Sequence, residues 1–270
     1  MMTSAFFDYH AKKIHYSTEG QGNTLVLLHG FMESLLIWRD FSQELSKNFN
    51  VVCIDLPGHG KTECISEVHS MELITDIVKQ ITDHLKIDNF VLIGHSMGGY
   101  ASLQFADQYP NMLKGLGLFH SQALADTEET KKNRDRTCEI VKQSRKNFIS
   151  QFIPDLFAPE NVEKFAAEIS ILQSQVIDMT AEAIIAAQNG MKIREDKLNV
   201  LTDLQVPILF ILGKKDSRVA VQQGMAQAML PNHSEILLLN VGHMGYIEAR
   251  DQTLFTMKAF AEKCFAFAQK

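Results

Sequence analysis

Six short apolar runs set the strongest limit on how this chain of 270 residues can fold. They are rich in Val, Ile and Leu and show no alternation of polar and apolar residues, a pattern typical of strands buried on both faces of a sheet. The stretches between them carry apolar residues at three- and four-residue spacing, which predicts amphipathic helices. Because strands and helices alternate, we expect an α/β fold with a mostly parallel sheet flanked by helices. The runs are residues 24–30, 50–56, 89–95, 113–120, 207–213 and 234–240.

The start of the chain has a different pattern. Residues 5–10 and 12–20 alternate polar and apolar side chains, as half-buried antiparallel strands do. These two segments are therefore expected to form an antiparallel hairpin at one edge of the sheet.

Residues 122–199 interrupt the alternation of strands and helices. No run in this block resembles a strand, and Pro159 followed by Glu160 is typical of the first turn of a helix. Because the sheet resumes at Val206, we expect residues 122–199 to be a helical lid inserted at the strand ends of a core made of residues 1–121 and 200–270. The expected helices of this lid cover residues 126–145, 159–176 and 180–191.

Composition and charge exclude several classes of partner. The formal net charge is -6, with acidic and basic residues mixed along the chain, so we expect no nucleic acid and no anionic membrane surface as a partner. The first residues lack a basic segment followed by an apolar one, and no later stretch is long and apolar enough to span a bilayer. We therefore expect a cytoplasmic protein that acts on a small molecule; the sequence predicts no oligomeric state.

The cysteines and short motifs give no sign of a metal or a cofactor. The four cysteines are widely spaced without a CxxC pattern, which argues against both a disulfide framework and a zinc site. The GKT at residues 60–62 resembles the end of a phosphate-binding loop, but Asp55 stands where that loop needs a glycine. We therefore expect no nucleotide, no cofactor and no metal.

Residues 94–98, Gly-His-Ser-Met-Gly, fit the pattern G-x-S-x-G between a buried strand and a helical stretch. A sharp strand-to-helix turn would hold Ser96 in a strained backbone conformation. Glycines are needed beside it because a Cβ there would collide with the neighbouring strand or helix. The N-terminus of the following helix directs free N–H groups and its dipole toward charge that develops at Ser96. This context favours a nucleophile over a turn residue.

A serine nucleophile needs a base, and the base needs an orienting acid. His243 follows the last expected strand, so its loop lies at the same carboxyl edge of the sheet as Ser96. Asp216 follows the strand expected over 207–213 and is the preferred acid, although an aspartate here could also be a simple turn residue. Its rivals Asp196 and Asp203 precede that strand and so fall at the opposite end of the sheet.

The turn after the first parallel strand is expected to supply a donor to the oxyanion. Gly30 allows the chain to bend so that the N–H of Phe31 joins the N–H of Met97 at the site. His29 opens this turn and is expected to brace the loop by hydrogen bonds, not to act as the base.

Several residues are candidates for lining the pocket. Phe31, Met32, Met97 and Met244 are expected to make its acyl side apolar. His120 ends a strand at the same edge and could either line the pocket or be packed below it.

The expected lid carries four cations within residues 131–136, namely Lys131, Lys132, Arg134 and Arg136. A solvated helix face whose charges pair with nearby glutamates is the simpler interpretation. Contact with a substrate carboxylate is the alternative.

Five segments in chain order resemble the α/β-hydrolase superfamily, and the match that they mark out spans nearly the whole chain outside the lid. The resemblance implies an α/β-hydrolase fold with Ser96 as nucleophile, Asp216 as acid, His243 as base, and the N–H groups of Phe31 and Met97 as oxyanion donors. In the segment 55–62 the family pattern is a structural loop, so no catalytic part is assigned to its Asp and His residues. The segments are HGF at 29–31, DLPGHGKT at 55–62, GHSMGG at 94–99, LGKKDSRV at 212–219 and GHMGYIE at 242–248.

The expected activity is that of a carboxylesterase-like serine hydrolase. Such an enzyme cleaves a carboxylic ester or thioester of a small molecule through an acyl-enzyme on Ser96. The motifs equally suit a C–C bond hydrolase or a lyase of the menaquinone pathway type that acts on a carboxylate-bearing metabolite. A ligand-binding receptor without catalysis, built on the same scaffold, is the alternative of another class.

Overall fold

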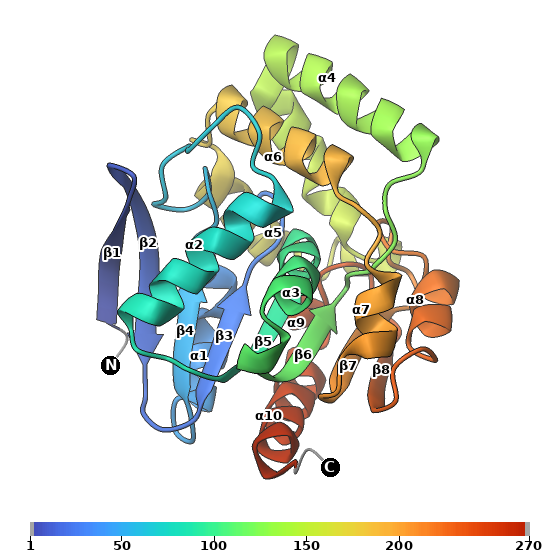
Figure 1. Ribbon diagram of the computed structural model, residues 1–270. Coiled ribbons are helices and arrows are strands. Elements are labelled where there is room, and N and C mark those ends of the chain that lie inside the picture. The colour runs from blue at the N-terminus through green and yellow to red at the C-terminus, as the bar shows by residue number, and fades with distance from the viewer. Residues whose placement is uncertain (1–2, 268–270) are drawn as a thin grey trace.

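The computed structural model describes residues 3–267, and an eight-stranded sheet runs through it in the order β1-β2-β4-β3-β5-β6-β7-β8 (Figure 1). The six strands from β3 to β8 are parallel, as expected from the alternation of apolar runs and helices. The six predicted strands are confirmed within a few residues at each end. The strands are β1 Thr3–Tyr9, β2 Lys12–Glu19, β3 Thr24–Leu28, β4 Asn50–Ile54, β5 Phe90–His95, β6 Leu113–Phe119, β7 Ile208–Gly213 and β8 Ser234–Leu239.

The predicted hairpin at the sheet edge is also present. β1 and β2 are antiparallel, and β2 joins the rest of the sheet by antiparallel pairing with β4. The turn between them places His10 and Ala11 in the left-handed region, with φ of 49° and 65°. This tight turn therefore sets the register of the hairpin.

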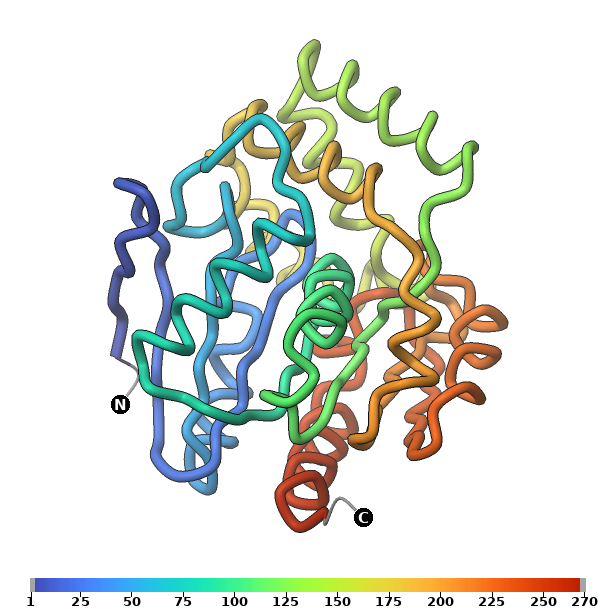
Figure 2. The backbone as a smooth tube through the Cα atoms, in the orientation of Figure 1, coloured from blue at the N-terminus to red at the C-terminus, as the bar shows by residue number. Residues whose placement is uncertain are grey.

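Helices cover both faces of the sheet (Figures 1 and 2). α2, α3 and α7 lie on the face toward the viewer, and α1 and α10 lie on the far face. None of the helices between residues 3 and 267 combines the length and apolar composition that a bilayer-spanning helix needs. The helices of this core are α1 Arg39–Leu45, α2 Met71–His84, α3 Met97–Gln108, α7 Leu198–Asp203, α8 Val221–Gln227, α9 Gly245–Glu248 and α10 Arg250–Ala266, with short 3-10 helices η1 Leu35–Trp38 and η2 Pro110–Met112.

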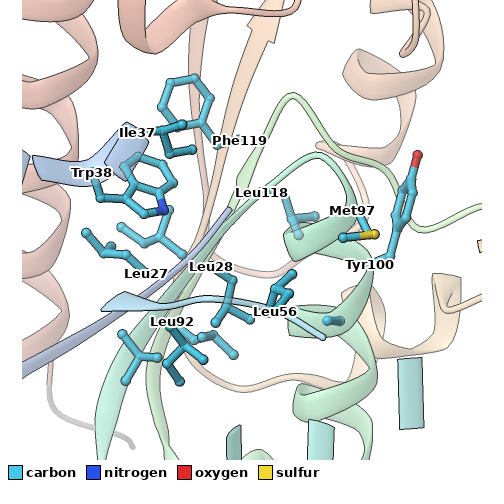
Figure 3. Packing of buried hydrophobic residues seen from close by; sticks show 14 of the residues in the cluster. Leu27, Leu28, Ile37, Trp38, Leu56, Leu92, Met97, Tyr100, Leu118 and Phe119 are labelled. Atoms are coloured by element: carbon cyan, nitrogen blue, oxygen red, sulfur yellow. The ribbon is translucent and has the colours of Figure 1, made fainter. Parts of the chain in front are cut away.

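The core is centred on β3 and β5, in which every residue is buried. On one side of these strands Trp38 packs against Phe119, with ring centroids 6.0 Å apart, and on the other side Met97 and Tyr100 lie on α3 (Figure 3). Burial of one large apolar side chain contributes about 1.5–3 kcal/mol to folding. The continuous apolar sequence of the central strands is thus explained by contacts on both faces.

The prediction that the run 234–240 is buried on both faces is wrong. β8 is the last strand of the sheet and pairs only with β7. Ile236 and Leu238 are each 40% exposed, whereas Leu239 at the end of the strand is buried. The apolar run therefore forms an edge strand that is covered on one face only.

Between β6 and β7 the chain forms the expected helices: α4 Glu128–Phe152, α5 Ala166–Val176 and α6 Ala181–Ile193. α4 and α6 pack side by side beyond the carboxyl ends of the parallel strands (Figure 1). α4 runs past the expected end at residue 145, and Ser144 within it has non-helical φ and ψ of -155° and 71°, which kinks the helix. The short helices η3 Pro154–Leu156 and η4 Pro159–Asn161 follow, and Pro159 begins the second of them as expected.

Asp55 organises the loop after β4, as expected of a structural residue. Its buried carboxylate accepts hydrogen bonds from the N–H groups of Leu35 and Lys61, at 2.7 and 2.9 Å, and from His15 Nδ1 at 2.6 Å. A Cβ at Gly60, where φ is 54°, would lie 2.2 Å from the Asp55 carboxyl carbon, so the loop closes tightly around this group. The carboxylate therefore joins strand β2, helix η1 and the loop.

Replacing Asp55 with Asn should lower the free energy of unfolding by about 3 kcal/mol, because an amide cannot accept all three hydrogen bonds and leaves a buried pair broken. Urea denaturation measures the effect. Asp40→Asn, at an exposed position, is the control and should change stability by less than about 0.5 kcal/mol. Equal stability of the two variants would contradict the role assigned to Asp55.

Candidate active site

Ser96 lies at the turn between β5 and α3 and has φ of 50° and ψ of -114°, a strained conformation for a residue with a Cβ. The adjacent backbones approach so closely that glycine is required, as expected. A Cβ at Gly94 would lie 2.2 Å from the Gly98 carbonyl oxygen, and one at Gly98 would lie 2.6 Å from the His29 carbonyl oxygen. The strain at Ser96 is thus held in place by the packing of β5, α3 and the end of β3.

The structure brings together the predicted base and acid. His243 Nδ1 lies 2.9 Å from both carboxylate oxygens of Asp216 and donates to this group. Oδ1 also accepts hydrogen bonds from the N–H groups of Arg218 and Val219, at 2.8 and 3.0 Å. Burial raises the pKa of the Asp216 carboxyl, but the facing histidines outweigh it and hold the pKa well below its usual range. Asp216 is therefore an anion that fixes the ring of His243 with Nε2 free to act as a base.

The two rival aspartates lie outside this arrangement. Asp196 and Asp203 are exposed. The first accepts a hydrogen bond from the Leu198 N–H and the second from the Thr202 hydroxyl. Both act within their own surface segments.

Two positions were expected for His120, lining the pocket or packing below it, and the structure shows the second. His120 is fully buried, is not part of the cavity wall, and donates from Nδ1 to the Asp216 carboxylate at 2.9 Å. Burial lowers the pKa of its ring to about 4, although Asp216 acts in the opposite direction. His120 is thus neutral and serves as a second hydrogen-bond donor to the Asp216 carboxylate, from a position outside the cavity wall. Sequence reasoning missed this role because only the fold places the end of β6 beside the loop after β7.

Three donor atoms of His120, Asp216 and His243 lie within 4.8 Å of one another, and among residues 3–267 this is the one His, Cys, Asp and Glu cluster with spacing suited to a metal ion. Both histidines direct Nδ1 at the carboxylate. The donor set is therefore already used for mutual hydrogen bonds that orient His243.

A cavity of about 300 Å³ opens beside Ser96 and His243. Within the described chain, the Ser96 hydroxyl and the His243 ring share this wall without a hydrogen bond between them. Such contacts are often long in unliganded sites and shorten when substrate binds. Other residues of the wall are Phe31, Glu33, His95, Tyr100, Thr130, Asn133, Arg134, Thr137, Phe152, Leu156, Gln188, Met191, Ser217 and Arg218.

The expected apolar residues divide between the cavity wall and the core. Phe31 lines the cavity and packs edge-on against Phe152 of α4, with ring centroids 5.5 Å apart. Met32, Met97 and Met244 are buried and are not among the lining residues, contrary to expectation. Met32 has φ of 58° and lies between two residues of the cavity wall, Phe31 and Glu33.

The two predicted oxyanion donors have free N–H groups. Among residues 3–267, neither Phe31 nor Met97 donates its backbone N–H to another group. A Cβ at Gly30 would lie 3.1 Å from Ser96 Cβ, so the peptide leading to Phe31 passes directly beside the serine. His29 braces this turn as expected, because its Nδ1 donates to the Gly30 carbonyl at 2.7 Å and its Nε2 accepts from the Leu56 N–H at 2.9 Å.

A buried carboxylate that the sequence analysis did not single out lies beside this turn. Glu33 accepts hydrogen bonds from the Gly30 N–H at 2.5 Å, from His95 Nδ1 at 3.0 Å and from the Tyr246 hydroxyl at 3.1 Å. His95 Nε2 in turn donates to the His243 carbonyl at 3.0 Å. Glu33 therefore connects the oxyanion turn with the residue before the nucleophile and the loop of the base.

Glu33 and His95 form a buried ion pair. Burial lowers the pKa of His95, but the charge of Glu33 outweighs it and raises the pKa of the ring, and the pKa of Glu33 is lowered in return. Both ring nitrogens of His95 face acceptors, which requires the doubly protonated ring. The one signal in the sequence was a carboxylate three residues after the HG turn, and nothing local indicated that it would be buried.

The loop of His243 is tied to residues 154–161, here called the cap segment. The His243 N–H donates to the Leu156 carbonyl at 2.7 Å. Glu248 accepts hydrogen bonds at 3.0 Å from the N–H groups of both Gly242 and Ala158. The base and the cap segment are therefore held by the same group of hydrogen bonds.

A strained serine beside free amide donors, with a carboxylate-oriented histidine in the same cavity, is the arrangement of serine hydrolases with the α/β fold. A family model described as the alpha/beta hydrolase fold matches residues 23–160, and the chain belongs to this family. Membership of this family, together with similarity to known hydrolases, identifies the chain as a hydrolase.

Three similar proteins cover most of the chain. It is 30% identical over 258 residues to the dihydrolipoyllysine-residue acetyltransferase component of the acetoin cleaving system of Pseudomonas putida, covering 90% of this chain and 65% of that protein. It is 26% identical to a pimeloyl-[acyl-carrier protein] methyl ester esterase of Pectobacterium atrosepticum, covering 95% of this chain and 98% of that one. A malate-bound structure of a thermophilic esterase from Thermogutta terrifontis has a TM-score of 0.91 with 27% identity, covering 97% and 99% of the two chains.

Replacing Glu33 with Gln should lower the free energy of unfolding by about 3–5 kcal/mol, because the imidazolium of His95 loses its buried counter-ion. Guanidinium denaturation followed by fluorescence measures the loss. Glu44→Gln is the matched control, because the Glu44 side chain is 44% exposed and its carboxylate accepts a hydrogen bond from the exposed Lys47. A loss no larger than that of the control would show that the Glu33 pair does not hold the site together.

Acid should destabilise the protein through His120. Its pKa is about 4 in the folded state and 6.5 ordinarily, so between these values the unfolded chain binds a proton that the folded chain does not. The contribution of neutral His120 to the free energy of unfolding is fully present above pH 6.5. It is lost as the pH falls toward 4, at up to about 1.4 kcal/mol per pH unit. Urea denaturation at several pH values should show a shallower slope for His120→Asn, whereas substitution of the exposed His10 should leave the slope unchanged.

Proposed function

We propose that the protein hydrolyses a carboxylic ester or thioester of a small molecule through an acyl-enzyme on Ser96. The observation that carries this proposal is the bond from His243 Nδ1 to the buried Asp216 carboxylate, at 2.9 Å, beside a cavity whose wall also contains Ser96. A cavity of about 300 Å³ is at the small end of ligand pockets, which favours a small substrate.

In the first half of the reaction, Ser96 Oγ attacks the carbonyl carbon and His243 Nε2 takes the serine proton. The Asp216 carboxylate stabilises the imidazolium that forms. The oxyanion accepts hydrogen bonds from the N–H groups of Phe31 and Met97. When the tetrahedral intermediate collapses, the C–O or C–S bond to the leaving group breaks and the imidazolium returns its proton to that group.

In the second half, water enters the place of the leaving group. His243 takes a proton from it as it attacks the acyl carbon, and the same two N–H groups hold the second oxyanion. Collapse releases the carboxylic acid and returns the proton to Ser96. Helices α4 and α6, which lie over the strand ends, act in this proposal as the lid that limits access of bulk water.

Ser96→Ala and His243→Ala should each lower kcat/KM for p-nitrophenyl butyrate by roughly 1,000-fold or more, because the nucleophile and its base act as one unit. Asp216→Asn should lower it substantially, since the His243 ring would lose its counter-charge and its preferred tautomer. Asp196→Asn is the matched control and should keep wild-type activity.

The same measurements distinguish the alternatives. Wild-type turnover in Ser96→Ala would contradict the proposal, as would a loss in Asp196→Asn greater than that in Asp216→Asn. Labelling of Ser96 by a fluorophosphonate probe without turnover of any ester or thioester would favour a ligand-binding receptor. Turnover of a vinylogous diketone alone would favour a C–C bond hydrolase.

A further inference from the structure

We infer that Arg134 forms a carboxylate-binding subsite in the cavity, so that the favoured substrates are monoesters of short dicarboxylic acids. The inference rests on the proposed ester hydrolysis for the reaction, but it concerns binding and can be tested without turnover. It begins from a group of three charges, Asp126, Arg134 and Arg194, of which Arg134 lines the cavity.

One buried carboxylate serves two guanidinium groups. The Asp126 side chain is 3% exposed, and Arg194 Nη1 donates to its Oδ1 at 2.5 Å. Arg134 Nε donates to the other oxygen, Oδ2. Arg194 and Arg134 side chains are 4% and 15% exposed, so an excess of one positive charge is held largely away from water. Burying an uncompensated charge is costly, and an anion in the cavity would offset that cost.

Arg194 also makes two hydrogen bonds to backbone carbonyls. It donates from Nη1 to the Met191 carbonyl at 2.9 Å and from Nη2 to the Leu124 carbonyl at 3.0 Å. Its guanidinium carbon lies 4.0 Å from the centroid of the Tyr100 ring. Arg194 is not part of the cavity wall. Its role is to fix Asp126.

Arg134 does line the cavity and keeps donor capacity for a ligand. Nη1 donates to Gln188 Oε1 at 3.0 Å and to Met191 Sδ at 3.5 Å. Nη2 carries two N–H groups but has one bond, a long one of 3.4 Å to Asp126 Oδ1. Because Ser96 lies in the same cavity wall, a carboxylate on Arg134 would position the far end of a substrate whose ester reaches the serine.

The other charges facing the cavity are compensated. Glu33 is paired with His95, and Arg218 donates to Asp155 at 2.6 Å. The surplus charge therefore lies at Arg134.

The other three cations of the predicted cluster do not line the cavity. Lys131 pairs with Glu128 at 2.9 Å, Lys132 is exposed, and Arg136 is an exposed side chain that reaches Asn133 at 3.4 Å. The solvated-face interpretation thus describes these three. Arg134 alone of the four is placed to meet a substrate.

Binding of monomethyl glutarate and of methyl pentanoate to Ser96→Ala, measured by calorimetry, tests the subsite without turnover. We expect the monoester to bind more tightly than the neutral ester. Adding Arg134→Gln should weaken binding of the monoester by on the order of tenfold and leave the neutral ester unchanged. The fold should survive, because Asp126 keeps its bond to Arg194.

Arg136→Gln is the matched control on the same helix and should change neither affinity. Equal binding of the two esters, or equal effects of Arg134→Gln and Arg136→Gln, would overturn the inference. If melting shows that Arg134→Gln is unfolded, Arg134→Lys takes its place. That variant keeps the charge but loses the forked pair of donors. Its affinity for the monoester should therefore be lower than that of the chain with Arg134 and higher than the affinity for the neutral ester.

Turnover separates the two proposals. In the chain with Ser96 present, kcat/KM should favour monomethyl glutarate over methyl pentanoate, and Arg134→Gln should remove the preference. A binding preference without hydrolysis of either ester would contradict the proposed function and support the subsite. Hydrolysis of both esters at equal efficiency, with equal binding, would support the proposed function and contradict the subsite.

Discussion

Hydrogen bonds between buried carboxylates and histidines hold together the loops at the carboxyl edge of the sheet. Asp55 binds His15, Glu33 binds His95, and Asp216 binds both His120 and His243. Each carboxylate also accepts a backbone N–H from a loop: Glu33 from Gly30, Asp55 from Lys61 and Asp216 from Arg218. A parallel sheet brings several irregular loops to one edge, and these groups satisfy loop N–H donors that would otherwise be buried without a partner.

The fold could be predicted from the sequence because its signals are local. The apolar runs gave the strands, and the turn around Ser96 followed from the steric needs of Gly94 and Gly98, which the backbone distances confirm. The edge strand β8 was misread because an apolar run does not reveal which strand lies last in the sheet.

The site was predictable only in part, because several of its contacts join residues far apart in the chain. His243 and Asp216 could be paired by their places after strands. The partners of Glu33 and His120 could not, since Glu33 meets Tyr246 across 213 positions and His120 meets Asp216 across 96. The cation cluster of α4 shows the same limit. Helical spacing alone did not reveal that Arg134 turns inward while Arg136 faces solvent.

The hydrogen bonds of Glu248 and Leu156 have a mechanical consequence. They join the loop that carries His243 to the cap segment, so these two parts form one rigid unit. Displacing the cap segment would carry the imidazole away from the serine.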